Sequence, residues 1–209
     1  MSKEAQKRIE ARRLERIRRE NKEKLDSNTA PFSIPKIFKD VEWGDYNSSK
    51  YPKKFVAEMK KLASDKTSWY LFGSFGSGKS RFLHLFAKHL YLELGFRQVK
   101  LIRYSDMMKL VGMEYGKFIE TDEFKECKEC SILLVDDIRK IEGRSHHEYD
   151  AFVDLLDARI ENGLTTCFTS NLPPTKISED NGRITSRFTR ILKDKKNVKV
   201  FRESFVGDL

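Results

Sequence analysis

The sequence predicts an α/β fold in which a five-stranded parallel sheet lies between two layers of helices. Three observations predict it. Residues 73–80 read G-S-F-G-S-G-K-S, a complete phosphate-binding loop between an apolar run and an amphipathic segment. Short apolar runs alternate with helical patterns along the rest of the chain. One of these runs, Ile132–Val135, ends in the acidic pair Asp136-Asp137. Together they predict a three-layer nucleotide-binding domain.

The first part of the chain is a charged arm. Residues 1–27 contain ten Lys and Arg against six Asp and Glu, and no Gly or Pro. This composition predicts a helix from Ser2 to Asp26 without a core-facing stripe, about 40 Å long at 1.5 Å per residue. Turn-forming residues between Ser27 and Pro35 predict a linker. We therefore divide the chain into an arm with its linker, residues 1–30, and a nucleotide-binding domain, residues 31–209; the arm is either a solvated tail or a docking element.

The phosphate loop follows the first predicted strand, Trp69–Phe72, and precedes a predicted helix, Arg81–Leu94. In this order, backbone N–H groups and the helix N-terminus surround the phosphates of a nucleotide. A lysine adds positive charge to the same oxygens, and the serine after it supplies a hydroxyl ligand for Mg²⁺. The predicted cofactors are thus ATP and Mg²⁺. The predicted binding residues are Gly73, Ser74, Phe75, Gly76, Ser77, Gly78, Lys79, Ser80 and Arg81.

Four further strands are predicted from apolar runs. The helix between the third and fourth strands is marked by a capping box of Ser145 and Glu148 and by Gly163 at its end. Its apolar stripe contains Phe152, Leu155, Leu156 and Ile160. Alternation of this kind predicts a parallel sheet covered on both faces. The four strands are Gln98–Tyr104, Ile132–Val135, Thr165–Thr169 and Val198–Phe201.

The acidic pair stands where a buried strand delivers carboxylates to a metal-nucleotide site. Asp136 is predicted to hold Mg²⁺, and Asp137 to polarise the water that attacks the γ-phosphate. An ordinary strand-end turn would also explain two acids here, but the phosphate loop upstream favours the catalytic interpretation. If the fourth strand lies between the first and third, Asn171 would position the same water, although Ser-Asn is also common in turns.

A basic segment follows, with Arg183, Arg187 and Arg190. An arginine supplied by a neighbouring subunit stabilises the charge of a transferring phosphoryl group and contributes about 10³–10⁵ in rate. Hydrolysis would then depend on contact between subunits. The alternative is a solvated basic helix end.

With these elements together, the chain resembles the AAA+ ATPases, and most closely the helicase loaders of the DnaC and DnaI type. The resemblance extends from about Ile34 to the C-terminus and rests on G-S-F-G-S-G-K-S, L-V-D-D, F-T-S-N and R-I-T-S-R-F. It implies a cytoplasmic ATPase that binds a DnaB-type replicative helicase, places it on single-stranded DNA and self-associates. The implied roles are Walker A for Lys79 and Ser80, Walker B for Asp136 and Asp137, sensor 1 for Asn171 and an arginine finger, acting in trans, for Arg187.

One departure and two alternatives accompany this resemblance. Many AAA+ proteins have Asp-Glu where this chain has Asp136-Asp137, so the catalytic carboxylate is one methylene shorter and slow turnover is expected. A transposition helper of the IstB type shares nearly all these motifs. A protein that binds nucleotide as a switch, hydrolyses it negligibly and binds a helicase is the third possibility.

Two further patterns are candidate ligand sites. Loader relatives carry DNA-facing helices after the second strand, which makes Lys109, Lys117 and Phe118 candidates; a helix that packs Phe118, Ile119 and Phe124 into the core is the stronger alternative. Cys127 and Cys130 form a lone C-x-x-C, which lacks the further ligands that a zinc site needs.

The composition limits the partners and the compartment. The formal net charge is +9, and the basic residues gather at both ends of the chain, which favours a polyanionic partner. No run of about 18 apolar residues occurs, and the N-terminus lacks an apolar signal core, so we expect a cytoplasmic protein without a membrane span.

Overall fold

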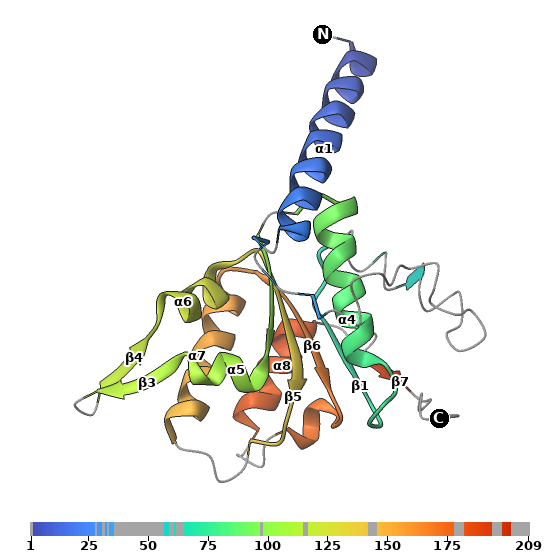
Figure 1. The fold of residues 1–209 in the computed structure, drawn as a ribbon. Coiled ribbons are helices and arrows are strands. Elements are labelled where there is room, and N and C mark those ends of the chain that lie inside the picture. Colours follow the sequence, from blue (N-terminus) through green and yellow to red (C-terminus); the bar gives the residue numbers. More distant parts are fainter. Residues whose placement is uncertain are drawn as a thin grey trace.

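The computed structural model describes residues 2–27, 29–30, 32, 34–35, 57–58, 61, 65–96, 98–114, 117–141, 146–177, 182–193 and 198–201 (Figure 1). The helices are α1 (Lys3–Asp26), α4 (Lys79–Lys88), the π-helix η2 (His89–Glu93), α5 (Tyr104–Lys109), α6 (Asp122–Glu129), α7 (His146–Glu161), the 3-10 turn η3 (Pro174–Lys176) and α8 (Arg183–Leu192). The strands are β1 (Trp69–Gly73), β2 (Val99–Arg103), β3 (Val111–Glu114), β4 (Lys117–Glu120), β5 (Ile132–Ile138), β6 (Thr165–Ser170) and β7 (Val198–Phe201).

The central sheet has the strand order β2-β5-β6-β1-β7, and all its pairs are parallel. The short β7 pairs with β1 at the edge. Strand β6 lies between β1 and β5, as the position of the predicted sensor requires. Strand β5 continues to Ile138, three residues beyond its predicted end, so the acidic pair belongs to the strand itself. The predicted α/β class is confirmed.

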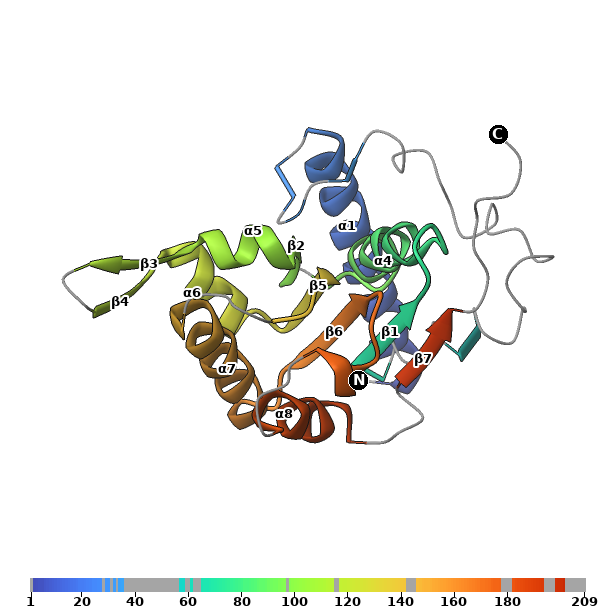
Figure 2. The ribbon, with the colours of Figure 1, turned by 90° about the horizontal axis from the view of Figure 1, so that it is seen from below.

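Helices cover both faces of the sheet (Figure 2). On one face Trp69 of β1 packs against Phe86 of α4, with ring centroids 5.1 Å apart. On the other face Tyr70 packs against Phe188 of α8, at 5.4 Å, beside α7. Successive residues of one strand therefore supply two separate cores, which explains the continuous apolar runs.

The helix that follows the phosphate loop is not α-helical to its predicted end at Leu94. It changes to a π-helix at His89, and the Leu94 N–H donates to the His89 carbonyl at 3.1 Å, five residues back. Gly95 follows with φ +70°, a left-handed conformation that ends the helix. The wider turn changes which carbonyls face the neighbouring helix.

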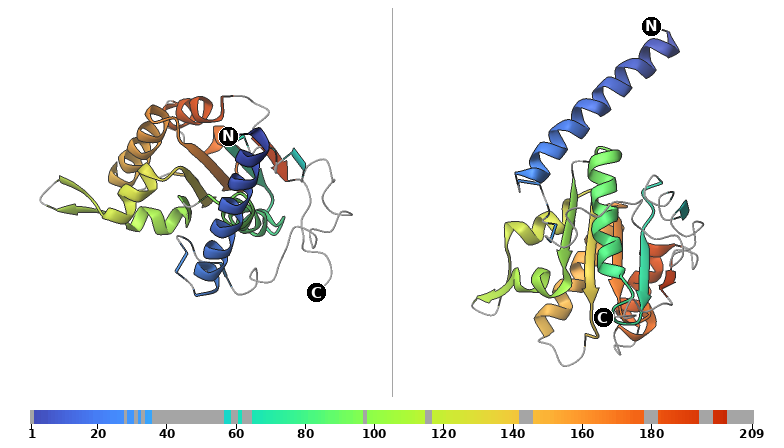
Figure 3. Two further views of the ribbon diagram at one scale, coloured as in Figure 1. Left: turned by 90° about the horizontal axis from the view of Figure 1, so that it is seen from above. Right: turned by 45° about the vertical axis from the view of Figure 1, so that its right-hand side comes forward.

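The arm is helical, but the prediction that it has no core-facing side is wrong for its second half. Asn21 is fully buried, and its Nδ2 donates to the Tyr91 carbonyl at 2.7 Å. Arg18 Nε donates to the Glu93 carbonyl at 2.7 Å. Phe32, in the predicted linker, is buried against the ring of Tyr91 at 5.4 Å. The first half of α1 extends away from the body (Figure 3). Hydrogen bonds to η2 thus act together with half-buried apolar side chains of α1, Leu14 and Ile17 beside Gly95 and Leu25 against the core.

The segment after β2 is a correction to the sequence prediction. A single helix was expected to pack Ile119 and Phe124 together, but the chain forms α5, an antiparallel β3–β4 hairpin and α6. Phe124 is buried in α6 as expected, whereas Ile119 lies in the hairpin and is 41% exposed. Figure 1 shows the hairpin reaching outward from the sheet.

Helix α7 agrees with its predicted stripe. Phe152, Leu155 and Leu156 are buried, and Gly163 has φ +61° two residues after the helix ends. Ser145 of the predicted capping box lies outside the described residues. No described helix has the length and apolar character needed to cross a bilayer.

Candidate functional site

The phosphate loop connects β1 to α4 in the predicted order. Gly76 and Gly78 have φ of +71° and +89°, conformations that a side chain would disfavour. Phe75 stands at the tip of the loop and is 79% exposed. Gly78 is the N-cap of α4 and offers no side-chain cap, as expected for a helix N-terminus that binds an anion.

Lys79 is the buried cation of the loop. Its Nζ donates to the carbonyls of Gly73 and Ser74, at 3.0 and 2.7 Å, and to Ser77 Oγ at 3.1 Å. An ammonium group has three donors, and here all three go to the loop itself. Burial lowers the pKa of Lys79, and the carboxylates of Asp137 and Asp136 oppose that shift. Phosphate oxygens that reach this position would replace neutral acceptors with charged ones.

The metal-binding residues meet at the ends of α4, β5 and β6. Ser80 Oγ donates to Asp136 Oδ1 at 3.0 Å. Thr169 Oγ1 donates to the same carboxylate oxygen at 2.5 Å. Asp136 is buried, 5% exposed. A hydroxyl and a carboxylate within hydrogen-bond distance are hard oxygen ligands of the kind Mg²⁺ takes beside nucleotide phosphates, so the residues present fit this ion.

Asp137 has a strained backbone and an engaged carboxylate. Its φ is +56°, in the left-handed region, which costs a residue of this kind about 1–3 kcal/mol. Arg139 donates to its Oδ2 from Nη2 at 3.0 Å and from Nε at 3.2 Å. Asn171 Nδ2 lies 3.4 Å from Oδ1, so the two predicted water-positioning residues are adjacent.

Arg187 is bound within its own chain. Its Nη2 donates to Asp157 Oδ2 of α7 at 2.6 Å, and its Nη1 to the Arg183 carbonyl at 3.0 Å. The side chain is 19% exposed. In this arrangement the guanidinium rests against α7, and contact with another subunit's nucleotide requires exchange of the Asp157 ion pair.

The candidate DNA contacts are only partly described. Lys109 is exposed at the end of α5, and its ammonium pairs with Asp106 at 2.8 Å. Lys117 and Phe118 lie in β4, and their side chains fall outside the described part of the chain. The hairpin therefore replaces the DNA-facing helix that the resemblance implied.

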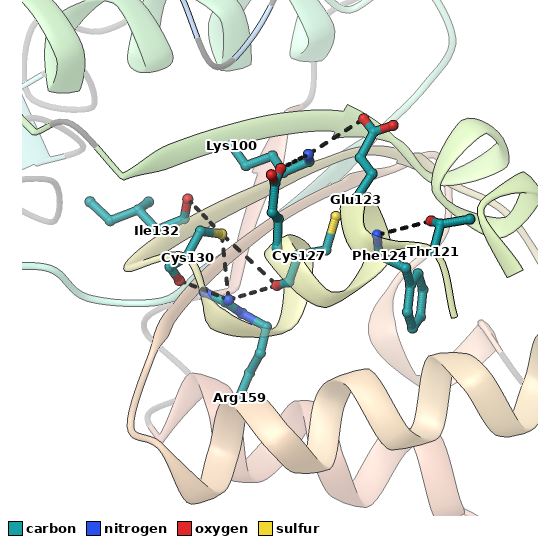
Figure 4. Close-up of polar contacts among 9 residues, drawn as sticks. Lys100, Thr121, Glu123, Phe124, Cys127, Cys130, Ile132 and Arg159 are labelled. Carbon is teal, nitrogen blue, oxygen red and sulfur yellow. Dashed lines mark hydrogen bonds and ion pairs between the residues drawn. The ribbon is translucent and has the colours of Figure 1, made fainter. Parts of the chain in front are cut away.

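The C-x-x-C segment surrounds a buried arginine (Figure 4). Arg159 of α7 is fully buried, and its Nη1 donates to the carbonyls of Cys127 and Cys130 at 2.8 and 2.9 Å. Its Nη2 donates to the Thr165 carbonyl at 2.6 Å, and Nε to Thr166 Oγ1 at 2.7 Å. Across the described residues, no group of three or more His, Cys, Asp or Glu is arranged to hold a metal ion. The hydrogen bonds of Arg159 connect α6, α7 and β6.

Sequence reasoning missed two site residues, Arg139 and Asp157, and it predicted Thr169 only as part of the polar strand end beside the γ-phosphate, without a role of its own. Thr169 carried a signal, because a hydroxyl in a strand that is buried along its whole length needs a partner. Asp157 lies one turn from Ile160 on α7, and its pairing with Arg187 depends on how α7 and α8 pack. The ion pair of Asp137 with Arg139 depends on the left-handed backbone of Asp137. A separation of two residues in the sequence does not predict that conformation.

Comparisons with known proteins agree with this geometry. The family model described as the bacterial DnaA ATPase domain matches residues 46–194. The chromosomal replication initiator protein DnaA of Burkholderia cenocepacia (strain HI2424) is 26% identical over 119 residues, and the match covers 57% of this chain and 22% of that protein. The DnaA of Burkholderia multivorans (strain ATCC 17616 / 249) matches over the same shares. The chain thus spans about a fifth of the length of these curated relatives.

Solved structures share the fold. A putative primosome component from Streptococcus pyogenes serotype M3 superposes with a TM-score of 0.62 at 19% identity, covering 86% of this chain and 96% of that one. DnaI gives 0.57 at 18%, covering 85% and 94%. The DnaC helicase loader gives 0.53 at 18%, covering 80% and 99%. Since the family model matches more than two thirds of the sequence, the chain belongs to the bacterial DnaA ATPase domain family and has the AAA+ fold that DnaI and DnaC share.

Proposed function

We propose that this protein is an ATP-dependent helicase loader of DNA replication, which binds a DnaB-type hexameric helicase and delivers it to single-stranded DNA. Nucleotide binding is supported by one observation above all: Ser80, Asp136 and Thr169 meet beside the phosphate loop. Lys79 lies within that loop and donates to its carbonyls. The loader part is supported by the fold shared with DnaI and DnaC along most of their lengths.

The residues would divide the reaction as follows. Lys79 and the loop amides bind the β- and γ-phosphates, and Arg81 lies in the first turn of α4, which begins at Lys79. Ser80 and Asp136 would hold Mg²⁺, which neutralises phosphate charge when bound. Asp137 accepts the proton of the attacking water, and Asn171, 3.4 Å away, orients that water. Arg187 of a neighbouring copy would stabilise the charge that develops on the transferring group.

Two ion pairs support slow hydrolysis by the isolated chain. Arg139 occupies the carboxylate of Asp137, and Asp157 occupies the guanidinium of Arg187. Both groups must exchange partners before they can act, so partner binding or DNA is expected to stimulate turnover. The same two contacts favour the second candidate function, a helicase-binding protein that uses nucleotide as a switch and hydrolyses it negligibly.

The basic arm is the proposed helicase contact. The first half of α1 extends from the body and carries exposed Lys and Arg, while its second half is held against η2. For single-stranded DNA, contact with about four phosphates predicts a log–log salt slope near −3, at about −0.7 for each phosphate. A slope near zero would remove DNA from the mechanism.

Native mass spectrometry tests the proposal directly. The protein is mixed with the replicative helicase of its source or host, in the presence of ATP or of ADP. A complex on the helicase hexamer that depends on the nucleotide is the expected result. If no complex forms with either nucleotide, the loader function fails, and a transposition helper of the IstB type, tested by binding to duplex DNA, takes its place. If the complex forms but ATP hydrolysis stays at the background rate in the presence of DNA, the result would favour the helicase-binding protein that uses nucleotide as a switch.

A further inference from the structure

The strand that carries the acidic pair is interrupted where the pair occurs. Strands β5 and β6 pair Val135 with Phe168 and Ile138 with Ser170. Between these pairs β5 has two residues, Asp136 and Asp137, and β6 has one, Thr169. This two-against-one arrangement is a bulge, which breaks the ladder of backbone hydrogen bonds and turns the bulged residues out of the strand.

The hydroxyl of Thr169 makes hydrogen bonds at the position where the ladder is broken. It accepts a hydrogen bond from the Asp137 backbone N–H at 2.9 Å, a donor that the bulge removes from the ladder. It also donates to Asp136 Oδ1 at 2.5 Å. A hydroxyl has one donor and two acceptor positions, so a single oxygen can make both contacts at once. Thr169 is 1% exposed and lies in the strand between β1 and β5, so its position is fixed.

We propose that Thr169 is the positioning residue of the metal site, whose hydroxyl sets the Asp136 carboxylate toward Mg²⁺ and holds Asp137 in its left-handed turn. This inference rests on the proposed nucleotide site. Thr169 is not among the residues assigned to the phosphates or to the metal; its hydroxyl contacts Asp136 and Asp137. It acts through two neighbours, one a metal ligand and the other the residue that faces the attacking water, so the metal position and the water position are set by one oxygen.

Side-chain chemistry makes the proposal specific. Valine has nearly the same shape as threonine but lacks the hydroxyl, so it would leave the Asp137 N–H and the Asp136 carboxylate without this partner. Serine keeps the hydroxyl and loses only a methyl group. Thr166 is the matched control, because it is a fully buried threonine of the same strand whose hydroxyl instead accepts from Arg159 Nε at 2.7 Å, away from the loop.

The experiment compares Thr169→Val, Thr169→Ser and Thr166→Val with the natural sequence. The affinity for a fluorescent ATP analogue is measured with Mg²⁺ and with EDTA, and the ratio of the two is the readout, together with the thermal midpoint of each protein. Partners that orient a metal ligand typically change metal affinity about 10–100-fold. Thr169→Val is expected to reduce the Mg²⁺-dependent gain at least tenfold, while Thr169→Ser and Thr166→Val keep it.

Other results would overturn the inference in distinguishable ways. If Thr169→Val binds the analogue with the natural Mg²⁺-dependent gain, Thr169 does not position the metal ligand. If Thr166→Val loses the gain as fully as Thr169→Val, the effect is a general consequence of a weakened strand. If the natural protein binds the analogue but gains no affinity from Mg²⁺, the metal site and this inference fail while the phosphate site stands; if it binds no analogue at all, the nucleotide site fails as well.

Discussion

Replacing Arg159 with methionine tests the network that joins α6, α7 and β6. Methionine keeps most of the side-chain volume and removes every donor. The carbonyls of Cys127, Cys130 and Thr165 and the hydroxyl of Thr166 then lose their partner in a buried region. Hydrogen bonds to a charged group contribute about 1.5–3 kcal/mol each, so four of them give an upper bound of about 6–12 kcal/mol.

An opposing effect reduces that figure. The guanidinium is fully buried, and burial lowers the pKa of Arg159, partly opposed by the cysteine side chains. Removal of a buried cation recovers several kcal/mol of desolvation. We therefore expect Arg159→Met to reduce the free energy of unfolding by about 3–5 kcal/mol. In a chain of this size that lowers the thermal midpoint by about 10 °C.

Urea denaturation followed by circular dichroism measures this loss. Arg190→Met is the matched control, since Arg190 is an exposed arginine of α8, and it should change stability by less than about 0.5 kcal/mol. Arg159→Lys, which keeps the charge but not the planar set of donors, should fall between the two. A loss below about 1 kcal/mol for Arg159→Met would refute the reasoning, because the orphaned carbonyls would then have found other partners.

Four further predictions follow from the contacts described above. Lys79→Ala should weaken binding of an ATP analogue at least about a hundredfold, because it removes the buried cation of the loop; unchanged affinity in a fluorescence titration would exclude the loop as the phosphate site. Asp157→Asn frees Arg187 from its ion pair and should raise steady-state ATPase activity several-fold at high protein concentration, an effect that a second change, Arg187→Ala, must abolish. Burial raises the pKa of Cys127 to about 12 from 9.0, so the contribution of this thiol to stability is complete below pH 9 and is lost as pH rises toward 12, by about 1.4 kcal/mol for each pH unit; the unfolding free energy of Cys127→Ala, measured with urea between pH 9 and 11, should fall less steeply by that amount, while Cys130 and Cys167, whose pKa values burial also raises, keep their share, and an unchanged slope would contradict the shift. Asn21→Ala removes the buried hydrogen bond from α1 to η2, so amide exchange in α1 should accelerate while exchange in β5 stays slow; equal protection in both proteins would show that the arm is held by other contacts.

The parts of the fold that the sequence predicted are those where local pattern and function coincide. The loop at Gly73–Ser80 needs glycine at left-handed positions and a lysine and a serine at fixed spacing, so the sequence alone predicts its phosphate-binding chemistry. The first three residues of strand β1 and the first four residues of β5 are buried in the middle of the sheet, and a position buried on both faces favours the continuous apolar runs by which the sequence predicted them. Asn171 was expected beside the water site on the condition that the fourth strand lies between the first and third, and the strand order of the structure meets that condition.

The remaining features depend on contacts between distant segments. Asn21 reads as one more polar residue of a charged helix, yet it is buried because η2 presents a carbonyl to it. The hairpin at Val111–Glu120 was missed because Phe118, Ile119 and Phe124 were assigned to one helix, although their separations of one, five and six residues do not place them on one helical face. In the structure Ile119 is exposed and lies across from Gly112 in the hairpin. The ion pair of Arg187 with Asp157 follows from the packing of α8 on α7 and has no local signal.

The π-helix η2 connects the arm, α1, to the helix that follows the phosphate loop. Lys79 and η2 belong to one continuous helical segment, and η2 holds α1 through Asn21 and Arg18. Gly95 adds a close fit, since a side-chain carbon there would lie 2.9 Å from Leu14. The arm is a helix of 24 residues, about 36 Å long at 1.5 Å per residue. A tilt of about 5° at its base would move its tip by about 3 Å, so a small shift of the loop on nucleotide exchange would reach a partner as a displacement the width of a side chain.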